Sequence, residues 1–358
     1  MKVKIVSIYS IIHFIIDFSC AVLVINTVTP HLSGVLSIFW AMVIYNFFAF
    51  AMQLPIGIIA DKVNKNALCS AIGCILVAIA LGLSNLGILA CLIAGLGNSM
   101  FHVGGGIDVL NISNKKATLS GIFVSTGAMG IYLGGQSFFL DYDKNYIIII
   151  ILLLSALSLI WLYHQIKEKV HNEEMIVPKL NNTKIAIIAC LIITVCIRGY
   201  VGLILSFEWK SNFILAVISI CAVVLGKMLG GVIGDKIGFL KTSLLSLMIS
   251  AIFFIFAFDN SVLGILAILF FNMTMPITLT ALSNILYHNK GMAFGLLTLA
   301  LFIGAVPVFF GYTQTIFTPI GLFLVTIVSL IALCVGIKKY DIIMENEEWF
   351  WVYWFPYF

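Results

Sequence analysis

Long apolar runs are the feature that most constrains how this chain can fold. Many of them reach about 20 residues, the length at which a helix rising about 1.5 Å per residue crosses the hydrocarbon core of a bilayer. Inside hydrocarbon every backbone N–H and C=O group must find its hydrogen-bond partner within the protein, so such a run folds as a helix. Charged residues make up only 9% of the chain, against roughly 25% in an ordinary soluble domain. The sequence therefore predicts an all-α polytopic membrane protein.

The apolar runs predict twelve transmembrane helices in two groups of six. The first group lies near residues 5–28, 34–60, 68–84, 86–110, 117–139 and 145–164. The second group lies near residues 184–206, 211–234, 242–258, 261–286, 292–313 and 316–337. We therefore expect an N-terminal six-helix half (1–164), a cytoplasmic linker (165–183), a C-terminal six-helix half (184–339) and a cytoplasmic aromatic tail (340–358). The tail carries Trp349, Trp351 and Trp354, residues that favour the membrane interface.

Basic residues predict the orientation of the spans, because Lys and Arg are retained on the cytoplasmic side of a membrane. One face of the predicted topology collects Lys2, Lys4, Lys62, Lys65, Lys115, Lys116, Lys167, Lys169, Lys179, Lys184, Lys236, Lys241, Lys290, Lys338 and Lys339. The other face has only Lys144 and Lys210. Both termini are therefore expected in the cytoplasm, in a multi-pass protein of the cell (inner) membrane. The first apolar run has no persuasive cleavage site, so we expect it to be retained as a span.

A short motif occurs twice in the chain. Gly57–Lys62 reads Gly-Ile-Ile-Ala-Asp-Lys, and Gly231–Lys236 reads Gly-Val-Ile-Gly-Asp-Lys, at an offset of 231 − 57 = 174 residues. The same offset relates Asn98 to Asn272, Lys116 to Lys290, Gly121 to Gly295 and Gly130 to Gly304. The chain is therefore interpreted as a duplicated unit, which in an apolar protein predicts two membrane-embedded halves related by an internal repeat.

Composition and motif content exclude several functional classes. Basic residues lie in short runs between apolar segments, so we expect no nucleic-acid partner. All eight cysteines fall inside apolar runs without Cys-x-x-Cys spacing, which is typical of small residues in helix packing. The chain has no phosphate-binding loop, nucleophile elbow or metal-ligand spacing. We therefore expect no cofactor, no metal site and no enzymatic activity.

The duplicated motif carries a family resemblance. Gly57–Lys65 resembles the cytoplasmic loop signature of the major facilitator superfamily, and Gly231–Gly238 resembles its copy in the second half. The resemblance implies two rocking six-helix halves. It also implies a gate in which each aspartate pairs with neighbouring helix ends and basic residues. The gating residues are then Gly57, Asp61, Lys62, Gly231, Asp235 and Lys236. The alternative for each Asp is a solvated loop charge of little energetic weight.

Two pairs of polar residues lie inside predicted spans. His13 and Asp17 are four residues apart and share a face of the first span, and Asn98 and His102 do so in the fourth. An ionisable residue at this depth is costly to bury and is usually functional. Because a carboxyl group beside an imidazole can take up and release protons, we expect proton coupling at Asp17, His13 and His102. The alternative is a structural hydrogen bond between helices.

These pairs resemble a more specific family. His13-x-x-x-Asp17 together with Gly97–His102 is similar to the first and fourth spans of the fosmidomycin-resistance family of drug–proton antiporters. That resemblance implies proton-coupled export. The family continues Phe-His-Pro-Glu and then an Arg, whereas the corresponding positions here hold Val103, Gly104 and Ile107. The substrate of that family is therefore not transferred to this chain.

The fifth span contains three spaced glycines, Gly121, Gly130 and Gly134. Their spacing resembles the glycine signature of proton-coupled exporters, although Gly135 stands where that signature has proline. Small residues at such intervals allow helices to pack closely, and we expect these glycines to do so. Asp108, near the cytoplasmic end of the fourth span, is interpreted as a second gating charge or as an interfacial one.

The second half contributes two buried cations. Arg198 in the seventh span needs an anion, carbonyl groups or water around it, so it faces either Asp17 or a ligand that carries carboxylate or phosphate. Lys227 lies about 12 Å along the eighth span from Asp235, where it lines the cytoplasmic vestibule, or instead snorkels or pairs locally. With Asn98 and Asn272, these residues form the predicted substrate-binding set.

One functional hypothesis joins these features: the two halves rock about a central site, and proton movement drives movement of a small organic solute. The preferred form is export of a small anionic or amphiphilic compound in exchange for protons. An alternative is uptake of a small organic anion by proton symport. A hypothesis of another class, a non-transporting membrane sensor or scaffold, explains the aromatic tail but not the duplicated motif. We expect the substrate, protons and the lipid bilayer as partners of a monomeric protein.

Overall fold

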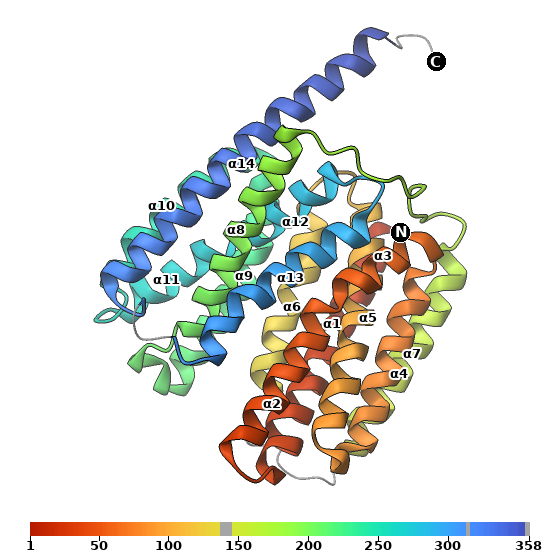
Figure 1. Ribbon diagram of the computed structural model, residues 1–358, viewed down its shortest axis with the longest axis vertical. Helices are drawn as coiled ribbons and strands as arrows, with labels where there is room; N and C mark the ends of the chain where they lie inside the picture. The colour runs from red at the N-terminus through yellow and green to blue at the C-terminus, as the bar shows by residue number, and fades with distance from the viewer. Residues whose placement is uncertain (137–144, 313–315, 355–358) are drawn as a thin grey trace.

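A computed structural model describes residues 1–136, 145–312 and 316–354, with side chains up to Glu345. Every regular element in these ranges is helical, in agreement with the all-α prediction, and the helices gather into two bundles (Figure 1). Lys144 and the side chains of the aromatic tail, including Trp349 and Trp351, lie outside the described residues.

Among the described residues, seven α-helices lie before the linker. They are α1 (Lys2–Ala21), α2 (Val35–Asn46), α3 (Gln53–Val63), α4 (Asn66–Gly82), α5 (Ile88–Ile112), α6 (Thr118–Gly134) and α7 (Asn145–Ile166). A π-helical segment, Val22–Val28, extends α1, and a second one, Phe47–Ala51, leads from α2 towards α3. Together α2, this segment and α3 form one candidate membrane span, Val35–Val63, which corresponds to the predicted span 34–60.

Seven helices also follow the linker. They are α8 (Asn182–Ile204), α9 (Phe213–Ile237), α10 (Phe239–Phe256), α11 (Ser261–Asn272), α12 (Thr274–Ile285), α13 (Lys290–Phe309) and α14 (Pro319–Trp354). Asn181, Asn212 and Asn260 start α8, α9 and α11 by accepting hydrogen bonds from backbone N–H groups of the first turn. Asparagine is one of the preferred residues at this position because it satisfies amides that have no partner within the helix.

Ten helical segments of the described chain are long and apolar enough to cross a membrane. Two further apolar helices, α4 and α6, have 17 residues each and correspond to the predicted spans 68–84 and 117–139. Residues 137–139 of the second of these lie outside the described residues. The membrane-spanning architecture is thus supported, and the count of twelve spans stays a prediction.

The packing partners of the helices repeat between the two halves. In the first half α1 packs against α6, and in the second half α8 packs against α13. Likewise α4 contacts α5 and α7, as α10 contacts α11 and α14. The halves meet through α3 with α13 and through α6 with α9, which are equivalent pairs under the repeat. The internal duplication seen in the sequence therefore describes the arrangement of the helices as well.

Glycines bring the helices of the two halves into backbone contact. A Cβ atom at Gly57 of α3 would collide with the backbone of Gly291 at the start of α13, and one at Gly231 of α9 would collide with that of Ala117 before α6. Gly121 faces the backbone of Lys227 on α9 in the same way. Because only glycine leaves this space free, these positions fix how closely the halves approach each other.

The linker crosses one end of the bundle, which we call the linker end. Residues 167–181 connect α7 to α8 there, and the N-terminus lies nearby, because Met1 and Lys4 line one pocket with Lys169 (Figure 1). Helix α14 runs unbroken to Trp354 and projects beyond the other helices in Figure 1, although a tail was expected from residue 340. No Gly or Pro occurs between Ile337 and Trp354, so nothing in the sequence ends this helix.

Candidate functional site

A buried polar cluster joins α1 to α5. His13 and Asp17 lie one turn apart on α1, with His13 Nε2 3.2 Å from Asp17 Oδ2. His102 of α5 places its Nε2 atom 2.8 Å from His13 Nε2 and 3.7 Å from Asp17 Oδ1. Asn98 of α5 donates a hydrogen bond of 2.9 Å to Asp17 Oδ1. The two polar pairs that the sequence places on separate spans therefore form one site, which we call the His–Asp cluster.

The backbone orients both imidazole rings of the His–Asp cluster. His13 Nδ1 lies 2.7 Å from the carbonyl oxygen of Phe123 on α6, and His102 Nδ1 lies 2.9 Å from that of Asn98. The rings of Phe101 and Phe123 pack around His13. Side-chain exposure is only 6% for His13, 9% for Asp17 and 13% for His102. The three groups thus face each other in a setting that excludes most water.

Gly127 of α6 completes the His–Asp cluster and was missed by the sequence reasoning. A Cβ atom at Gly127 would collide with Asp17 Oδ2 and His13 Nε2, so any larger residue would displace both groups. The predicted glycines Gly130 and Gly134 lie on the same helix and contact the backbone of α1 at Phe14 and Phe18. The glycines of α6 therefore let α1 approach, and Gly127 makes room for its polar side chains.

The His–Asp cluster is also the one group, among the residues that the structure describes, whose donors are spaced for a metal ion. The candidate ligand atoms of His13, Asp17 and His102 all lie within 4.8 Å of one another. Two imidazoles and a carboxylate can bind a first-row transition metal. This spacing was not predicted, because ligands that come from two helices have no short separation in the sequence.

Neither Arg198 nor Lys227 pairs with a carboxylate among the described residues. Arg198 is only 7% exposed, donates from Nη1 to Thr278 Oγ1 at 3.2 Å, and leaves its buried Nε without a hydrogen-bond partner. Lys227 Nζ donates to the carbonyl of Val124 on α6 at 3.2 Å. Within the described ranges neither cation forms a salt bridge. The expected pairing of Arg198 with Asp17 is thus not formed in this arrangement.

Lys227 connects the cations to the His–Asp cluster electrostatically. Its charge interacts with those of Arg198 and Asp17, and it also acts on His102. The predicted binding residues Asn98 and Asn272 are engaged elsewhere. Asn98 holds Asp17, and Asn272 donates to the carbonyl of Ile268 on its own helix. The positive charges and the ionisable cluster therefore share one region between the halves.

Asp61 forms one contact across the halves at the linker end. Its carboxylate accepts hydrogen bonds from the backbone N–H groups of Gly291 at 2.7 Å and Met292 at 2.9 Å, in the first turn of α13. These amides have no acceptor within their own helix, and the helix dipole favours a negative charge there. The resemblance implied a carboxylate at a helix end, and Asp61 occupies such a position.

Asp235 makes the equivalent contact at the start of α6. Its carboxylate accepts hydrogen bonds from the N–H groups of Ala117 at 2.7 Å and Thr118 at 2.9 Å, and from the Thr118 hydroxyl at 2.5 Å. Ala117 and Gly291 differ by 291 − 117 = 174 residues, the offset of the repeat. Lys62 and Lys236 are exposed and have no hydrogen bond or ion pair in the described part of the chain.

The linker adds contacts to both halves that the sequence did not predict. The side chain of Asn172 accepts hydrogen bonds from Asn66 at 2.7 Å and Asn111 at 3.0 Å, and donates to the carbonyl of Ala60 at 3.0 Å. On the other half, Tyr287 donates to Glu173 at 2.8 Å, a hydrogen bond that raises the pKa of Tyr287. The linker therefore ties the two halves together beside Asp61.

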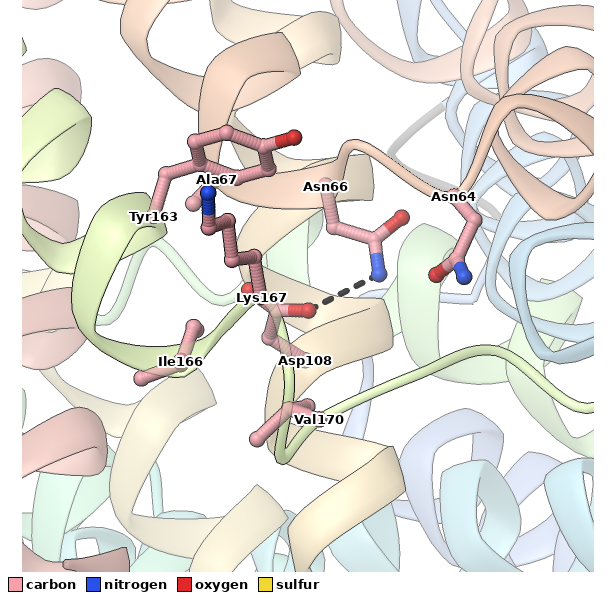
Figure 2. A pocket seen from close by; sticks show the side chains of 8 residues that line it. All are labelled: Asn64, Asn66, Ala67, Asp108, Tyr163, Ile166, Lys167 and Val170. Carbon is pink, nitrogen blue, oxygen red and sulfur yellow. Dashed lines mark hydrogen bonds between the residues drawn. The ribbon is translucent and has the colours of Figure 1, made fainter.

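Asp108 lies within the first half, where Figure 2 shows it in a small pocket. It accepts hydrogen bonds from Tyr9 at 2.6 Å and from Asn66 at 2.8 Å. Tyr163 of α7 and Lys167 of the linker line the same pocket, whose volume of about 10 Å³ suits a single water molecule. Asp108 makes no hydrogen bond or ion pair to the second half among the described residues, so its predicted gating role has no contact across the halves here.

A match to a family model identifies the family of this chain, and solved structures show a similar fold. The chain matches the family model of the Major Facilitator Superfamily over residues 6–306. A crystal structure of a variant of the E. coli fucose:proton symporter, FucP, superimposes with a TM-score of 0.68 at 10% identity, covering 94% of this chain and 99% of that one. A second structure of FucP, in the outward conformation, gives 0.64 at 12% identity, covering 93% and 99%. No curated protein sequence matches. The chain therefore belongs to the major facilitator superfamily.

Proposed function

We propose that this protein is a proton-coupled secondary active transporter of a small organic anion that works by alternating access. It crosses the cell membrane twelve times as a monomer, with the linker end and both termini in the cytoplasm. The observation that carries the proposal is the proximity of two kinds of charge: the His–Asp cluster in one half, and Arg198 with Lys227 in the other.

The His–Asp cluster supplies the proton site of this proposal. Its groups lie within candidate membrane spans, where ionisable residues usually serve transport. Asp17, His13 and His102 come from two helices of one half, so a change of charge acts on the packing of α1 against α5. This is the type of local change that can bias a two-state structure.

Arg198 and Lys227 supply the anion site. A buried guanidinium group with a free donor is costly unless an acceptor reaches it during the transport cycle. A carboxylate or phosphate provides such an acceptor and can bind Arg in a bidentate way. Asn98 and Asn272 remain candidate substrate ligands, although each would first have to leave its present hydrogen bond.

Electrostatics favours symport for an anionic substrate. A proton added to the His–Asp cluster makes the region more positive, so the proton strengthens anion binding and the anion strengthens proton binding. Proton-driven uptake of an anion follows from that mutual attraction. Export in exchange for protons remains the second hypothesis, because the motifs around His13 and His102 and the glycines of α6 resemble those of exporters.

The two aspartate caps supply the gate. Asp61 and Asp235 hold the halves together at the linker end, so the protein is closed there in this state. Opening towards the linker end requires both carboxylates to leave the amides of α13 and α6. Release of a few charge-assisted hydrogen bonds costs about 1.5–3 kcal/mol each, a size that substrate and proton binding can offset.

The test is proton-linked flux in proteoliposomes that enclose a pH-sensitive dye. External addition of small carboxylates and phosphorylated compounds, each in turn, should make the lumen acidic if anion and proton enter together. Exchange of anion for proton would make the lumen alkaline, which would support the export hypothesis instead. Neither result depends on the orientation of the protein in the vesicle.

Variants separate the proton site from the anion site. Asp17→Asn should abolish proton-linked flux while leaving anion exchange across the membrane, and Arg198→Gln should abolish both. Lys179→Ala, in an exposed linker position, serves as the control and should transport as the unaltered protein does. Absence of flux for every compound from a folded protein would favour the sensor or scaffold hypothesis.

A further inference from the structure

We infer that the His–Asp cluster binds one divalent transition-metal ion of the first row, through His13 Nε2, His102 Nε2 and Asp17 Oδ2. The sequence led us to expect no metal site in this chain. The site goes beyond the proposed function, because the ion binds whether or not the protein carries a solute. Its donor atoms come from two helices that pack against each other, α1 and α5.

The backbone leaves a lone pair free on Nε2 of each histidine. A carbonyl oxygen can only accept a hydrogen bond, so the contacts with Phe123 and Asn98 place a hydrogen on Nδ1 of both rings. A neutral imidazole of this tautomer has its lone pair on Nε2, and the two Nε2 atoms lie 2.8 Å apart. Histidines that bind a metal are usually held in this way, with the other ring nitrogen donating to a carbonyl or a carboxylate. Two converging lone pairs therefore need an electron-pair acceptor between them.

The position of Asp17 favours a metal ion as that acceptor. Asn98 donates to Oδ1, and Oδ2 lies 3.2 Å from His13 Nε2. A direct hydrogen bond between a charged imidazole and a carboxylate measures about 2.7–2.9 Å. The distances from Asp17 to His13 and to His102, 3.2 Å and 3.7 Å, are both longer. The carboxylate thus lies farther from both rings than such a hydrogen bond places it, as the third ligand of a shared ion does.

The separations of the donor atoms fit a common metal ion. Two ligands with bonds of about 2.0–2.2 Å to one ion lie about 2.8–3.6 Å apart when the bonds meet at right angles or at tetrahedral angles. The separations of 2.8 Å and 3.2 Å fall in this range, and all three candidate ligand atoms lie within 4.8 Å of one another. Imidazole ligands suit zinc or iron, whereas calcium and magnesium take oxygen ligands. The donor set therefore selects a transition metal.

The glycine beside the donors lets them converge. A Cβ atom at Gly127 would collide with Asp17 Oδ2 and His13 Nε2, two of the three donor atoms. Only glycine leaves both atoms in place at this position of α6. Because α6 also supplies the Phe123 carbonyl that holds His13, a bound ion fixes α1, α5 and α6 relative to one another.

The charge of Lys227 on α9 acts on the cluster. It interacts with that of Asp17 and also acts on His102. A divalent ion with one carboxylate keeps one net positive charge, and Lys227 opposes it. Removal of the Lys227 charge should therefore strengthen metal binding, an effect that a purely structural hydrogen-bond network would not show.

Zinc binding by tag-free, chelator-treated protein in lipid nanodiscs tests the site without any need for transport. Calorimetry at about pH 7.5 should show one saturable zinc ion per chain, and no binding of calcium or magnesium at the same concentration. Zinc X-ray absorption should show two imidazole rings, with nitrogen or oxygen ligands at about 2.0–2.2 Å. This spectrum is taken on the unaltered protein, so it does not depend on whether a variant folds.

Variants then assign the ligands. Asn98→Ala removes the group that orients Asp17 and should weaken zinc binding about 10- to 100-fold. His13→Asn and His102→Asn each remove a ligand and should weaken it further than that. Lys227→Gln should strengthen zinc binding, and a weaker affinity in this variant would contradict the location of the ion. His288→Asn, at the linker end and outside the cluster, is the matched control and should bind zinc as the unaltered protein does.

A pair of glycine variants tests the steric requirement. Gly127→Ala should weaken zinc binding, and Gly202→Ala, where an added Cβ meets open space, should leave it unchanged. The inference is overturned if the variant with both His13→Asn and His102→Asn binds zinc as tightly as the unaltered protein, because the ion then binds elsewhere. It is also overturned if the absorption spectrum shows no imidazole ligand.

Transport measurements separate the metal site from the proposed function. Bound zinc should block proton-linked flux, because the ion and the coupling proton need the same lone pairs. Flux that bound zinc leaves unchanged would overturn the proton site of the proposed function alone. Proton-linked flux in a protein that binds no zinc would overturn the metal site alone.

Discussion

Asp61 and Asp235 form the same contact in opposite directions across the interface between the halves. Asp61 of the first half caps α13 of the second, and Asp235 of the second caps α6 of the first. The two carboxylates and their amides are related by the same offset of 291 − 117 = 174 residues. The halves are therefore joined by a pair of equivalent contacts, and we expect loss of either one to weaken the same arrangement.

Asp61→Asn should loosen the start of α13. The change removes a charge from two backbone hydrogen bonds, each of which contributes about 1.5–3 kcal/mol when the acceptor is charged. Amide hydrogen exchange at Gly291 and Met292 should become about 10- to 100-fold faster if the lost free energy appears as local opening. Mass spectrometry of peptides that cover the first turn of α13 measures this.

Lys62→Gln is the matched control for that experiment. Lys62 adjoins Asp61 in the motif but is exposed and makes no polar contact within the described ranges. Exchange at the start of α13 should stay as in the unaltered protein. Equal effects of the two variants would show that the net charge of the motif, and not the helix cap, holds the linker end closed.

Gly57→Ala should disrupt the closed linker end by a steric route. The added methyl group would meet the carbonyl of Gly291, which belongs to the backbone and cannot turn aside. Exchange at Gly291 should rise as for Asp61→Asn, and the apparent midpoint of thermal unfolding should fall. Gly202→Ala places the same methyl group in open space on α8 and should stabilise the protein by about 0.5–1 kcal/mol or leave it unchanged. An unaltered midpoint for Gly57→Ala would contradict the contact.

The internal repeat and the apolar runs were enough to predict most of the fold. Apolar runs predicted where the helices lie, because inside a membrane the backbone N–H and C=O groups find hydrogen-bond partners only within the protein. The offset of 174 residues indicated which positions are equivalent, and Asp61 and Asp235 are indeed equivalent in their contacts. The sequence could not predict the donors of these hydrogen bonds, because the N–H groups of Ala117 and Gly291 belong to the backbone and have no motif of their own.

The candidate site was less predictable than the fold. Ionisable residues in apolar runs, such as His13 and Arg198, are conspicuous in a sequence, and the expectation that they lie inside the protein agrees with their burial. Their partners depend on how distant helices pack. Gly127 and Asn172 show no periodic or chemical signal, since one acts by having no side chain and the other lies in an irregular linker.

Asn172→Ala should weaken the hold of the linker on the first half. The side chain has hydrogen bonds to Asn66, Asn111 and the carbonyl of Ala60, each worth about 0.5–1.5 kcal/mol. Limited proteolysis should cut the linker several-fold faster in this variant, because release of the segment precedes cleavage. Lys179→Ala, in the same linker but exposed, should be cut at the original rate. Equal rates for Asn172→Ala and the unaltered protein would mean that the linker is held elsewhere.

Lys210, between α8 and α9, should make the stability of the protein depend on alkaline pH. Burial lowers its pKa to about 8, and Nζ donates to the carbonyl of Leu205 at 2.7 Å. In the unfolded chain the pKa of Lys210 is about 10.4. Between about pH 8 and about pH 10.4 the unfolded state therefore binds more protons than the folded state. The free energy of unfolding should therefore rise from about pH 8 to about pH 10.4 relative to that of the Lys210→Met variant, in which the side chain at this position does not titrate. Thermal unfolding of both proteins across this range measures the difference, and parallel curves would contradict the burial of Lys210.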